Sequence, residues 1–289
     1  MRYHYQFYAT ITVLSWGIGN VLTRVALRDF SPFAIGFWRY VIATVMLAIL
    51  VVAKKISPPA KADLPWFVFS GFTGFAFYMV AYNMGYVTVT AATGSVISAT
   101  VPLMTAALAW LIFKETLKAF QWFGVLLQFL GIVIIALAGG RFSVSEGVLW
   151  TLLSALSLSV YNLLQRKMTE KYSALQCSIY SIFCGTIMLA VFAPRSVHEL
   201  SSARVDTVFA VAFLGIFASA VAFLSWTKAL SLADKASQVS NFMFITPLIS
   251  TGLEIALFRE LPGAATLFGG VVILLGAFLF GRSKEHSYR

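Results

Sequence analysis

The residues of this chain that could do chemistry are amides, hydroxyls and aromatic rings set inside long apolar runs. Trp16 and Asn20 lie four residues apart, as do Tyr78 and Tyr82, and this spacing places each pair on one helix face. Such groups bind a solute by hydrogen bonds and ring stacking, or they hydrogen-bond neighbouring helices. The predicted substrate-pathway residues are Trp16, Asn20, Tyr78, Tyr82, Ser98, Tyr161, Asn162, Gln238 and Asn241.

The sequence contains no recognisable catalytic motif. Its three histidines, His4, His198 and His286, fall in two tails and a loop, and this distribution offers no metal-binding spacing. A glycine-rich phosphate loop with a lysine is absent, and so are the usual motifs around a serine or cysteine nucleophile. We therefore predict a protein that is not an enzyme and that uses no cofactor and no metal.

The elements that carry the polar residues must be membrane-spanning helices. Of the 289 residues, 60% are hydrophobic and 11% are charged, whereas a soluble domain has about 25% charged residues. The mean hydropathy is +0.86, and the apolar residues gather in runs near the roughly 20 residues that cross a bilayer as a helix. We predict an all-α membrane protein with ten transmembrane helices, at residues 7–27, 32–53, 65–86, 91–113, 119–139, 147–168, 173–193, 206–229, 236–258 and 263–281.

Tyr86, Trp66 and Trp122 fit a role at the membrane surface. All three lie near the ends of predicted helices. Aromatic rings form belts at both membrane interfaces, because one end of the ring system is apolar and the other is polar. We therefore leave these three residues out of the predicted pathway.

The net charge of +10 follows the predicted topology and not a nucleic-acid footprint. With the N-terminus inside, fourteen of the 21 lysines and arginines fall in cytoplasmic segments and five in external ones, while Arg24 and Arg39 lie within helices. This bias is the positive-inside rule. We therefore expect a multi-pass protein of the cell (inner) membrane with both termini in the cytoplasm, in contact with lipid and without a nucleic-acid partner. A monomer and a homodimer both stay open.

The two halves of the chain are weakly similar to each other. Residues 16–24 align with residues 158–166 at an offset of 142, through an asparagine and an arginine at matching places. The fourth and fifth predicted helices align with the ninth and tenth at an offset of 145. The matched residues there are Ser95 with Ser240, Pro102 with Pro247, and Phe113-Lys114-Glu115 with Phe258-Arg259-Glu260.

This similarity predicts two five-helix repeats, residues 1–140 and residues 141–289. The loop near residues 194–206 is expected to absorb the difference of three residues between the two offsets. Because five is an odd number, the second repeat enters the membrane from the opposite side. Inverted repeats of this kind place the substrate site between the two halves, near the midplane of the membrane.

At this point the sequence resembles a known family. Over essentially its whole length it is similar to the ten-helix EamA-type exporters of the drug/metabolite transporter superfamily. The resemblance implies that the first four and the sixth to ninth helices surround a central cavity, with the fifth and tenth at the periphery. It also implies export of small metabolites or amino acids. The residues that carry it are Trp16, Gly17, Asn20, Arg39, Pro102, Lys114, Glu115, Asn162, Gln165, Arg166, Thr246, Pro247, Arg259 and Glu260.

Two prolines lie at the centres of predicted helices. Pro102 and Pro247 cannot donate a backbone hydrogen bond, so each frees the carbonyl four residues earlier, at Ser98 and Met243. A freed carbonyl in hydrocarbon needs another partner or a cavity. We predict kinks that act as hinges of the pathway, with a fixed packing kink as the alternative.

Two charges, Arg39 and Glu254, fall clearly within predicted helices. An unpaired charge at this depth is costly, so we predict that they pair directly or through Asn83. The alternative for Arg39 is a structural role in which its long side chain reaches the interface. Glu254 is also the candidate for any coupling to protons, because it is the only carboxylate clearly inside a predicted helix.

These features predict a transporter that exports amino acids or related metabolites, aromatic ones included, by alternating access. The first and sixth helices offer Asn20 and Asn162 and not the carboxylate that proton antiport usually needs, so facilitated efflux is favoured. The first alternative is proton-coupled efflux of cationic drugs through Glu254. The second is a channel-like pore, which would need rings of carbonyls or like charges along its wall.

Overall fold

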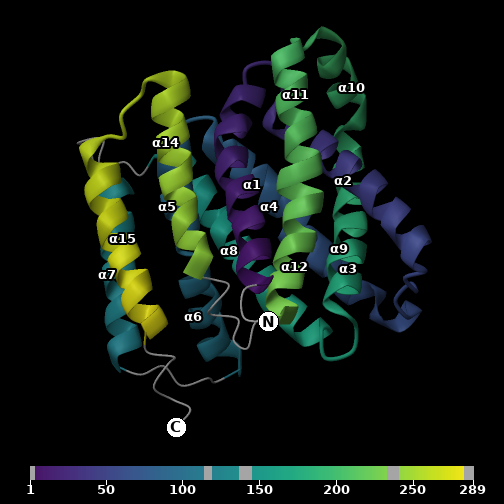
Figure 1. Ribbon diagram of the computed structural model, residues 1–289, viewed down its shortest axis with the longest axis horizontal. Helices are drawn as coiled ribbons and strands as arrows, with labels where there is room; N and C mark the ends of the chain where they lie inside the picture. The colour runs from purple at the N-terminus through teal and green to yellow at the C-terminus, as the bar shows by residue number, and fades with distance from the viewer. Residues whose placement is uncertain (1–3, 114–118, 137–144, 233–240, 283–289) are drawn as a thin grey trace.

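The chain folds into a bundle of helices. The computed structural model describes residues 4–113, 119–136, 145–232 and 241–282, and every element in these ranges is helical (Figure 1). The α-helices are α1 (His4–Ala26), α2 (Pro32–Lys54), α3 (Leu64–Gly71), α4 (Phe77–Tyr86), α5 (Ala91–Ser98), α6 (Val101–Phe113), α7 (Ala119–Ala136), α8 (Glu146–Met168), α9 (Ala174–Leu189), α10 (Ala193–Ser202), α11 (Val205–Phe213), α12 (Ala222–Leu232), α14 (Thr246–Phe258) and α15 (Ala264–Arg282).

Several of these helices are apolar enough to cross a membrane. Three shorter apolar stretches occur in α7, α14 and α15. The protein is therefore a multi-pass membrane protein, while the number of ten crossings stays a prediction. Among the described residues, six helical segments have both the length and the hydropathy of a membrane span, namely Pro32–Lys54, Lys61–Tyr86, Ala91–Ile112, Glu146–Gln165, Ala174–Ser202 and Val205–Trp226.

Two of the long segments contain a π-helical stretch. The stretch η2 (Phe72–Ala76) joins α3 to α4, and η4 (Leu214–Val221) joins α11 to α12. They occupy matching places in the two halves of the chain. A π stretch changes which backbone carbonyls are bonded within the helix, and such stretches concentrate at functional sites.

Both helices that contain a central proline are interrupted just before it. Helix α5 ends at Ser98 and α6 begins at Val101, so Pro102 is the second residue of the new helix. In the other half the 3-10 turn η5 (Asn241–Ile245) precedes α14, in which Pro247 is again the second residue. Proline is tolerated there because the first N–H groups of a helix have no intrahelical acceptor. The expected kinks are thus breaks between helices, and hinge motion at them stays a prediction.

Helices α7 and α15 pack side by side at one edge of the bundle (Figure 1). A Cβ atom added to Gly131 of α7 would lie 2.5 Å from Ile273 Cγ1, and one added to Gly276 of α15 would lie 2.9 Å from Gln128 Cγ. Gly276 and Ile273 each follow their counterparts, Gly131 and Gln128, by 145 positions. The two contacts are therefore reciprocal, as they are across a two-fold axis.

Helices α2 and α9 meet through matched residues as well. Thr44 Oγ1 and Thr186 Oγ1 share a hydrogen bond of 2.7 Å, and the two residues are 142 positions apart. Two equivalent residues can touch only near the axis that relates them, so this pair marks where the halves meet. At the same offset, Arg39 of α2 corresponds to Ser181 of α9.

The two ends of the bundle carry different polar contacts. At one end, hydrogen bonds from Arg204 and Thr207 to the Asp29 carboxylate lower the pKa of Asp29 to about 2. At the other end, Lys171 Nζ and the Asp63 carboxylate lie 2.5 Å apart. Helix α1 begins and α15 finishes at this second end (Figure 1). Among the described residues, the segments predicted to be external, such as that of Asp29, therefore lie at the Asp29 end, and those predicted to be cytoplasmic, such as that of Asp63, lie at the Asp63 end.

The loop expected near residues 194–206 is a helix over most of its length, so this prediction is wrong. Helix α10 (Ala193–Ser202) fills it, with Arg195 and Glu199 paired at 2.9 Å one turn apart. The stretch is polar, and hydropathy therefore separates it from the apolar runs. A surface helix needs only one apolar face, which average hydropathy does not detect.

Candidate functional site

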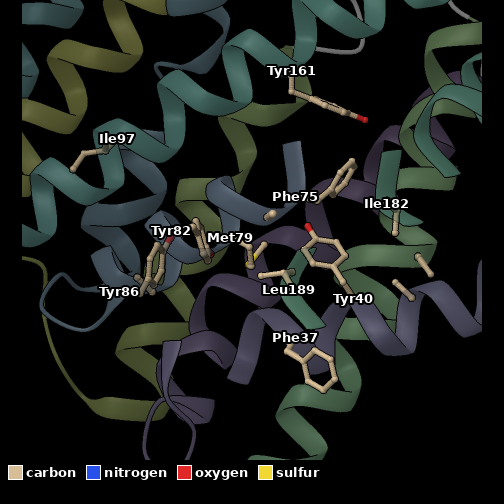
Figure 2. Close-up of a cluster of buried hydrophobic side chains, with 14 of the residues drawn as sticks. Phe37, Tyr40, Phe75, Met79, Tyr82, Tyr86, Ile97, Tyr161, Ile182 and Leu189 are labelled. Carbon is tan, nitrogen blue, oxygen red and sulfur yellow. The ribbon is translucent and has the colours of Figure 1, made fainter. Parts of the chain in front are cut away.

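A series of aromatic rings links α12 to α8 through the interior. Ring centroids lie 5.3 Å apart for Trp226 and Trp16, 5.9 Å for Trp16 and Phe223, and 5.3 Å for Phe223 and Phe75. Phe75 then contacts Tyr161 at 5.1 Å, and it lies between Tyr161 and Tyr40 (Figure 2). These distances are within the favourable range for aromatic pairs. We call this set, Trp16, Tyr40, Phe75, Tyr161, Phe223 and Trp226, the aromatic cluster.

The aromatic cluster draws its members from both halves of the chain and has a closed and an open side. Tyr40, Phe75 and Tyr161 are buried, whereas Trp16 and Trp226 are partly exposed. The partly exposed rings come from α1 and α12. Aromatic faces of this kind are suited to contact with an apolar or aromatic group.

Backbone carbonyls of the π stretches accept hydrogen bonds from side chains of other helices. Trp16 Nε1 donates to the carbonyl oxygen of Ala218 in η4 at 3.1 Å, and Arg39 Nη2 donates to the same oxygen at 3.3 Å. In the other half, Ser157 Oγ donates to the carbonyl oxygen of Thr73 in η2 at 2.7 Å. Each π stretch therefore accepts a side-chain hydrogen bond from the first helix of the opposite half.

A second polar group joins α1, α4 and α14. The Tyr82 hydroxyl donates to Asn20 Oδ1 at 2.7 Å, and Asn20 Nδ2 donates to Ser250 Oγ at 2.9 Å. The Tyr82 ring stacks on Tyr86 with 4.3 Å between centroids and lies 5.8 Å from the Tyr78 ring. We call these five residues the tyrosine network. Asn20 acts here both as an interhelical link and as a member of a buried polar site.

Tyr86 belongs to this network, and its assignment to the membrane interface is wrong. Its side chain is only 2% exposed, and a Cβ atom on Gly94 of α5 would lie 2.5 Å from its ring. Helix α5 therefore covers a ring that the position near a helix end suggests is exposed. Trp66 and Trp122, at 46% and 38% exposed, keep the exposure that an interface belt requires.

Glu254 lies near the Asp29 end, where it ties three helices together. Its side chain is 1% exposed, and its oxygens accept from the amides of Ala91 (2.9 Å) and Ala92 (2.8 Å) at the start of α5. Arg24 of α1 pairs with Glu254 and also with Glu260 at 3.0 Å. A carboxylate is stabilised at a helix N-terminus and beside a guanidinium. We call Arg24, Glu254 and Glu260 the Arg24 cluster.

The predicted pair of Arg39 with Glu254 is not formed. Arg39 Nε donates to Ser219 Oγ at 2.6 Å, and Asn83, the proposed link, donates to a backbone carbonyl of α2 at 2.8 Å. The prediction is wrong because it matched the two charges by depth alone. Helix α14 packs against α1, and this contact brings Arg24 to Glu254 instead.

A cleft of about 330 Å³ opens beside the Arg24 cluster. Arg24 and Arg28 flank the Phe258 ring, with their guanidinium carbons 4.9 Å and 5.4 Å from its centroid. Tyr86 lines the same cleft and stacks on Tyr82, so one residue of the tyrosine network borders the cleft. The Arg24 cluster therefore lies beside a cleft that the tyrosine network reaches through Tyr86.

The remaining predicted residues lie apart from these groups. Ser98 Oγ donates to the Gly94 carbonyl within α5 at 2.9 Å, and Asn162 Nδ2 donates to Thr105 Oγ1 at 3.2 Å, between α8 and α6. Gln238 and the side chains of Asn241 and Pro102 lie outside the described residues. The structure thus brings the predicted pathway residues together in two groups. Trp16 and Tyr161 belong to the aromatic cluster, and Asn20, Tyr78 and Tyr82 belong to the tyrosine network.

Sequence reasoning missed several residues of these groups. Phe75, Phe223 and Trp226 resemble ordinary apolar positions in the hydropathy pattern, and no spacing rule separates them from core residues. Arg24 has a usable signal, because it matches Arg166 in the other half at the offset of 142. A charge repeated at the same place in both halves indicates a role that the repeat preserves.

Solute binding is the chemistry that this arrangement supports. Within the part of the chain that the structure describes, no three His, Cys, Asp or Glu residues come together to hold a metal ion. The interior instead offers aromatic faces, hydroxyls, amides such as Asn20, and the Arg39 guanidinium. Groups of these kinds are found where proteins bind a small molecule with a polar head and an apolar body.

The known proteins that are similar to this chain are transporters. The EamA-like transporter family matches the chain twice, over residues 5–137 and residues 145–282. An uncharacterized transporter of Bacillus subtilis is 29% identical over 88% of this chain and 83% of its own length. A probable terminal-alkyne amino-acid exporter of Streptantibioticus cattleyicolor is 28% identical over 94% of this chain and 91% of its own.

Two further matches extend this comparison. An S-adenosylmethionine uptake transporter of Rickettsia prowazekii is 24% identical over 96% of this chain and 92% of its own length. A solved crystal structure whose sequence is 20% identical to this chain superposes on it with a TM-score of 0.66. The match covers 99% of this chain and 100% of the chain in that structure. At this identity the structural match concerns the fold alone.

Proposed function

Because this chain belongs to the EamA-like transporter family, we propose that it exports amino acids or related small metabolites by alternating access. Members of the family move solutes across membranes and are not enzymes, and the match confirms the resemblance found in the sequence. The single observation that carries the proposal is the aromatic cluster. It presents partly exposed rings of both halves beside buried hydrogen-bonding groups.

The proposed architecture is ten transmembrane helices in two inverted five-helix repeats, residues 1–140 and 141–289, around a central cavity. The reciprocal contacts of α7 with α15 support a two-fold relation between the halves, and so does the Thr44–Thr186 hydrogen bond. The matched π stretches support it as well. In transporters built this way the substrate lies between the repeats near the midplane.

The proposed orientation places the Asp63 end and both termini in the cytoplasm of a cell whose inner membrane holds the protein. Single cysteines at positions 58 and 198, in a chain without Cys177 and Cys184, test it. We expect a membrane-impermeant thiol reagent added outside intact cells to label position 198 and not position 58. This follows from the positive-inside bias. Labelling of position 58 from outside would overturn the orientation.

The proposed substrate has a polar or zwitterionic head and an apolar or aromatic part. The aromatic cluster suits the apolar part, and the tyrosine network offers rings and hydroxyls to a head group. Two relatives support an amino acid or a related compound as the substrate. One is named a probable terminal-alkyne amino-acid exporter, and the other is named an S-adenosylmethionine uptake transporter; S-adenosylmethionine is an amino-acid derivative. The small-molecule substrate and the lipid surroundings follow from the family.

Counterflow of a panel of labelled amino acids into proteoliposomes tests this function. We expect Trp16→Ala and Asn20→Ala each to reduce the rate for the best substrate by about tenfold or more, because each removes a contact of the proposed pocket and a loss of about 1.4 kcal/mol is tenfold. Trp66→Ala is the matched control, because Trp66 is 46% exposed at the Asp63 end, and it should transport normally. Unchanged transport by both site variants would show that the proposed pocket is wrong.

The same liposomes decide the energy coupling. Glu254 has both carboxylate oxygens occupied by Arg24 and the α5 amides, and this supports facilitated efflux without direct proton coupling. We therefore expect equal uptake with and without an imposed pH gradient. Concentrative uptake that needs the gradient and disappears in Glu254→Gln would instead establish proton coupling. Steady unitary currents in planar bilayers would point to a channel.

A further inference from the structure

Arg39 of α2 is a buried cation whose partners are all neutral. Its side chain is 6% exposed, and no carboxylate in the described part of the chain forms an ion pair with it. Nε donates to Ser219 Oγ at 2.6 Å, Nη2 to the carbonyl oxygen of Ala218 at 3.3 Å, and Nη1 contacts Met79 Sδ at 3.8 Å. A charge at this depth in a membrane protein usually has a counter-charge, which here is not supplied by the described chain.

Some N–H donors of the Arg39 guanidinium are not used in its hydrogen bonds. A guanidinium has five N–H groups, two on each terminal nitrogen and one on Nε. One N–H on each of Nη1 and Nη2 makes no hydrogen bond to the described residues, and the thioether of Met79 is only a weak acceptor. Two parallel donors on the terminal nitrogens are the arrangement that binds a carboxylate end-on through both oxygens.

The fold does not require a charge at this position. At the offset that relates α2 to α9, Arg39 corresponds to Ser181, a neutral residue that hydrogen-bonds Ser70 Oγ at 2.9 Å. The carbonyl oxygens of both residues are approached closely by a glycine of the opposite half, although the two glycines are not at equivalent positions. A Cβ atom on Gly215 would lie 3.0 Å from the Arg39 carbonyl oxygen, and one on Gly71 would lie 2.8 Å from the Ser181 carbonyl oxygen. One half of the protein therefore builds this contact without a cation.

The surroundings of Arg39 suit an anionic group attached to an aromatic body. Its guanidinium shares the Ala218 carbonyl with Trp16, so the cation and the exposed side of the aromatic cluster lie beside each other. The buried hydroxyl of Tyr40, the residue that follows Arg39 on α2, has no hydrogen-bond partner among the described residues. It is therefore a further unused donor on the same helix.

We propose that Arg39 binds the carboxylate of the transported solute, with the apolar part of that solute on Trp16 and its neighbours. The inference rests on the proposed function and refines it: the substrate class is a carboxylic acid or amino acid, and not a cation. The π stretch η4 positions the guanidinium through Ser219 and Ala218. The bound carboxylate would then provide the counter-charge that Arg39 lacks among the described residues.

Binding to the purified full-length protein in detergent tests the proposal independently of transport. The probes are two matched pairs, L-phenylalanine with L-phenylalaninamide and 3-phenylpropanoate with 3-phenylpropanamide, followed by the shift of the melting temperature. We expect each acid to stabilise the protein and each amide to have no comparable effect. Arg39→Gln should raise the half-saturating acid concentration by about tenfold or more, because a charge-assisted hydrogen bond is lost. Arg39→Lys should keep a weaker response.

The outcomes separate this inference from the proposed function. The control is Arg195→Gln, since Arg195 is exposed and paired within α10, and it should leave the acid response unchanged. Equal shifts by acids and amides, or no shift by any of the four probes, would overturn the carboxylate site. If Arg39→Gln still catalyses amino-acid counterflow, the proposed function stands and the carboxylate site at Arg39 is refuted. If the acids bind in an Arg39-dependent way but the protein catalyses no amino-acid counterflow, the carboxylate site stands and the proposed function is refuted.

Discussion

Replacing Glu254 with glutamine is expected to open the Asp29 end of the transporter. Glu254 is 1% exposed and joins α14 to Arg24 of α1 and to two amides of α5. Removing one member of a buried ion pair costs about 3–5 kcal/mol, and glutamine recovers part of this because it keeps one acceptor oxygen. A net loss of about 1.4 kcal/mol would favour the open arrangement tenfold.

Labelling of a buried cysteine measures this opening. Ser250, 0% exposed and one turn deeper than Glu254 on α14, is changed to cysteine in a chain without Cys177 and Cys184. We expect an impermeant thiol reagent added outside cells to react about tenfold faster or more when Glu254→Gln is added.

Glu260→Gln is the matched control for this experiment. Glu260 contacts the same arginine, but its side chain is 48% exposed, and exposed pairs contribute about 0–1 kcal/mol. Its effect should therefore stay below about fivefold. Equal rates in Glu254→Gln and the parent would show that the Arg24 cluster holds the helices together without controlling access.

Two glycine substitutions should cause large losses of stability. A Cβ atom on Gly71 would lie 2.8 Å from both the Gly185 nitrogen and the Ser181 carbonyl oxygen, and one on Gly215 would lie 2.6 Å from Ile42 Cβ. Real Cβ atoms do not approach other atoms so closely, and backbone atoms cannot move aside without shifting a helix. Overpacking of this kind costs about 1–3 kcal/mol.

Thermal melting of the purified variants measures this loss. For a chain of this size, Gly71→Ala and Gly215→Ala should each lower the melting temperature by several degrees, about 2–4 °C per kcal/mol. Gly252→Ala is the control, because nothing lies within 4 Å of its added Cβ atom, and it should not lower the melting temperature. Should Gly71→Ala and Gly252→Ala melt together, the close approach of α3 to α9 would be refuted.

The sequence alone determined the class of the protein and its general layout. Apolar runs of bilayer length predict membrane helices because the bilayer imposes the same requirement on every span, whatever its neighbours are. The repeat was readable for a similar reason, since Pro102 and Pro247 keep their positions within two halves that fold alike. The structure places both prolines at the second residue of a helix. The aromatic positions Trp16 and Tyr161 were also found from their spacing.

Only the tertiary structure decided which of these side chains meet. Glu254 pairs with Arg24, 230 residues away, because α14 packs on α1, and no pattern within either helix encodes that contact. The π stretches add a second reason. One extra residue in a helix turns the following side chains by about 100°, so a face assigned from regular spacing does not continue through η2 or η4. The buried Ala218 carbonyl that accepts from both Trp16 and Arg39 lies in such a stretch, and side-chain spacing does not predict which backbone carbonyls there accept side-chain hydrogen bonds.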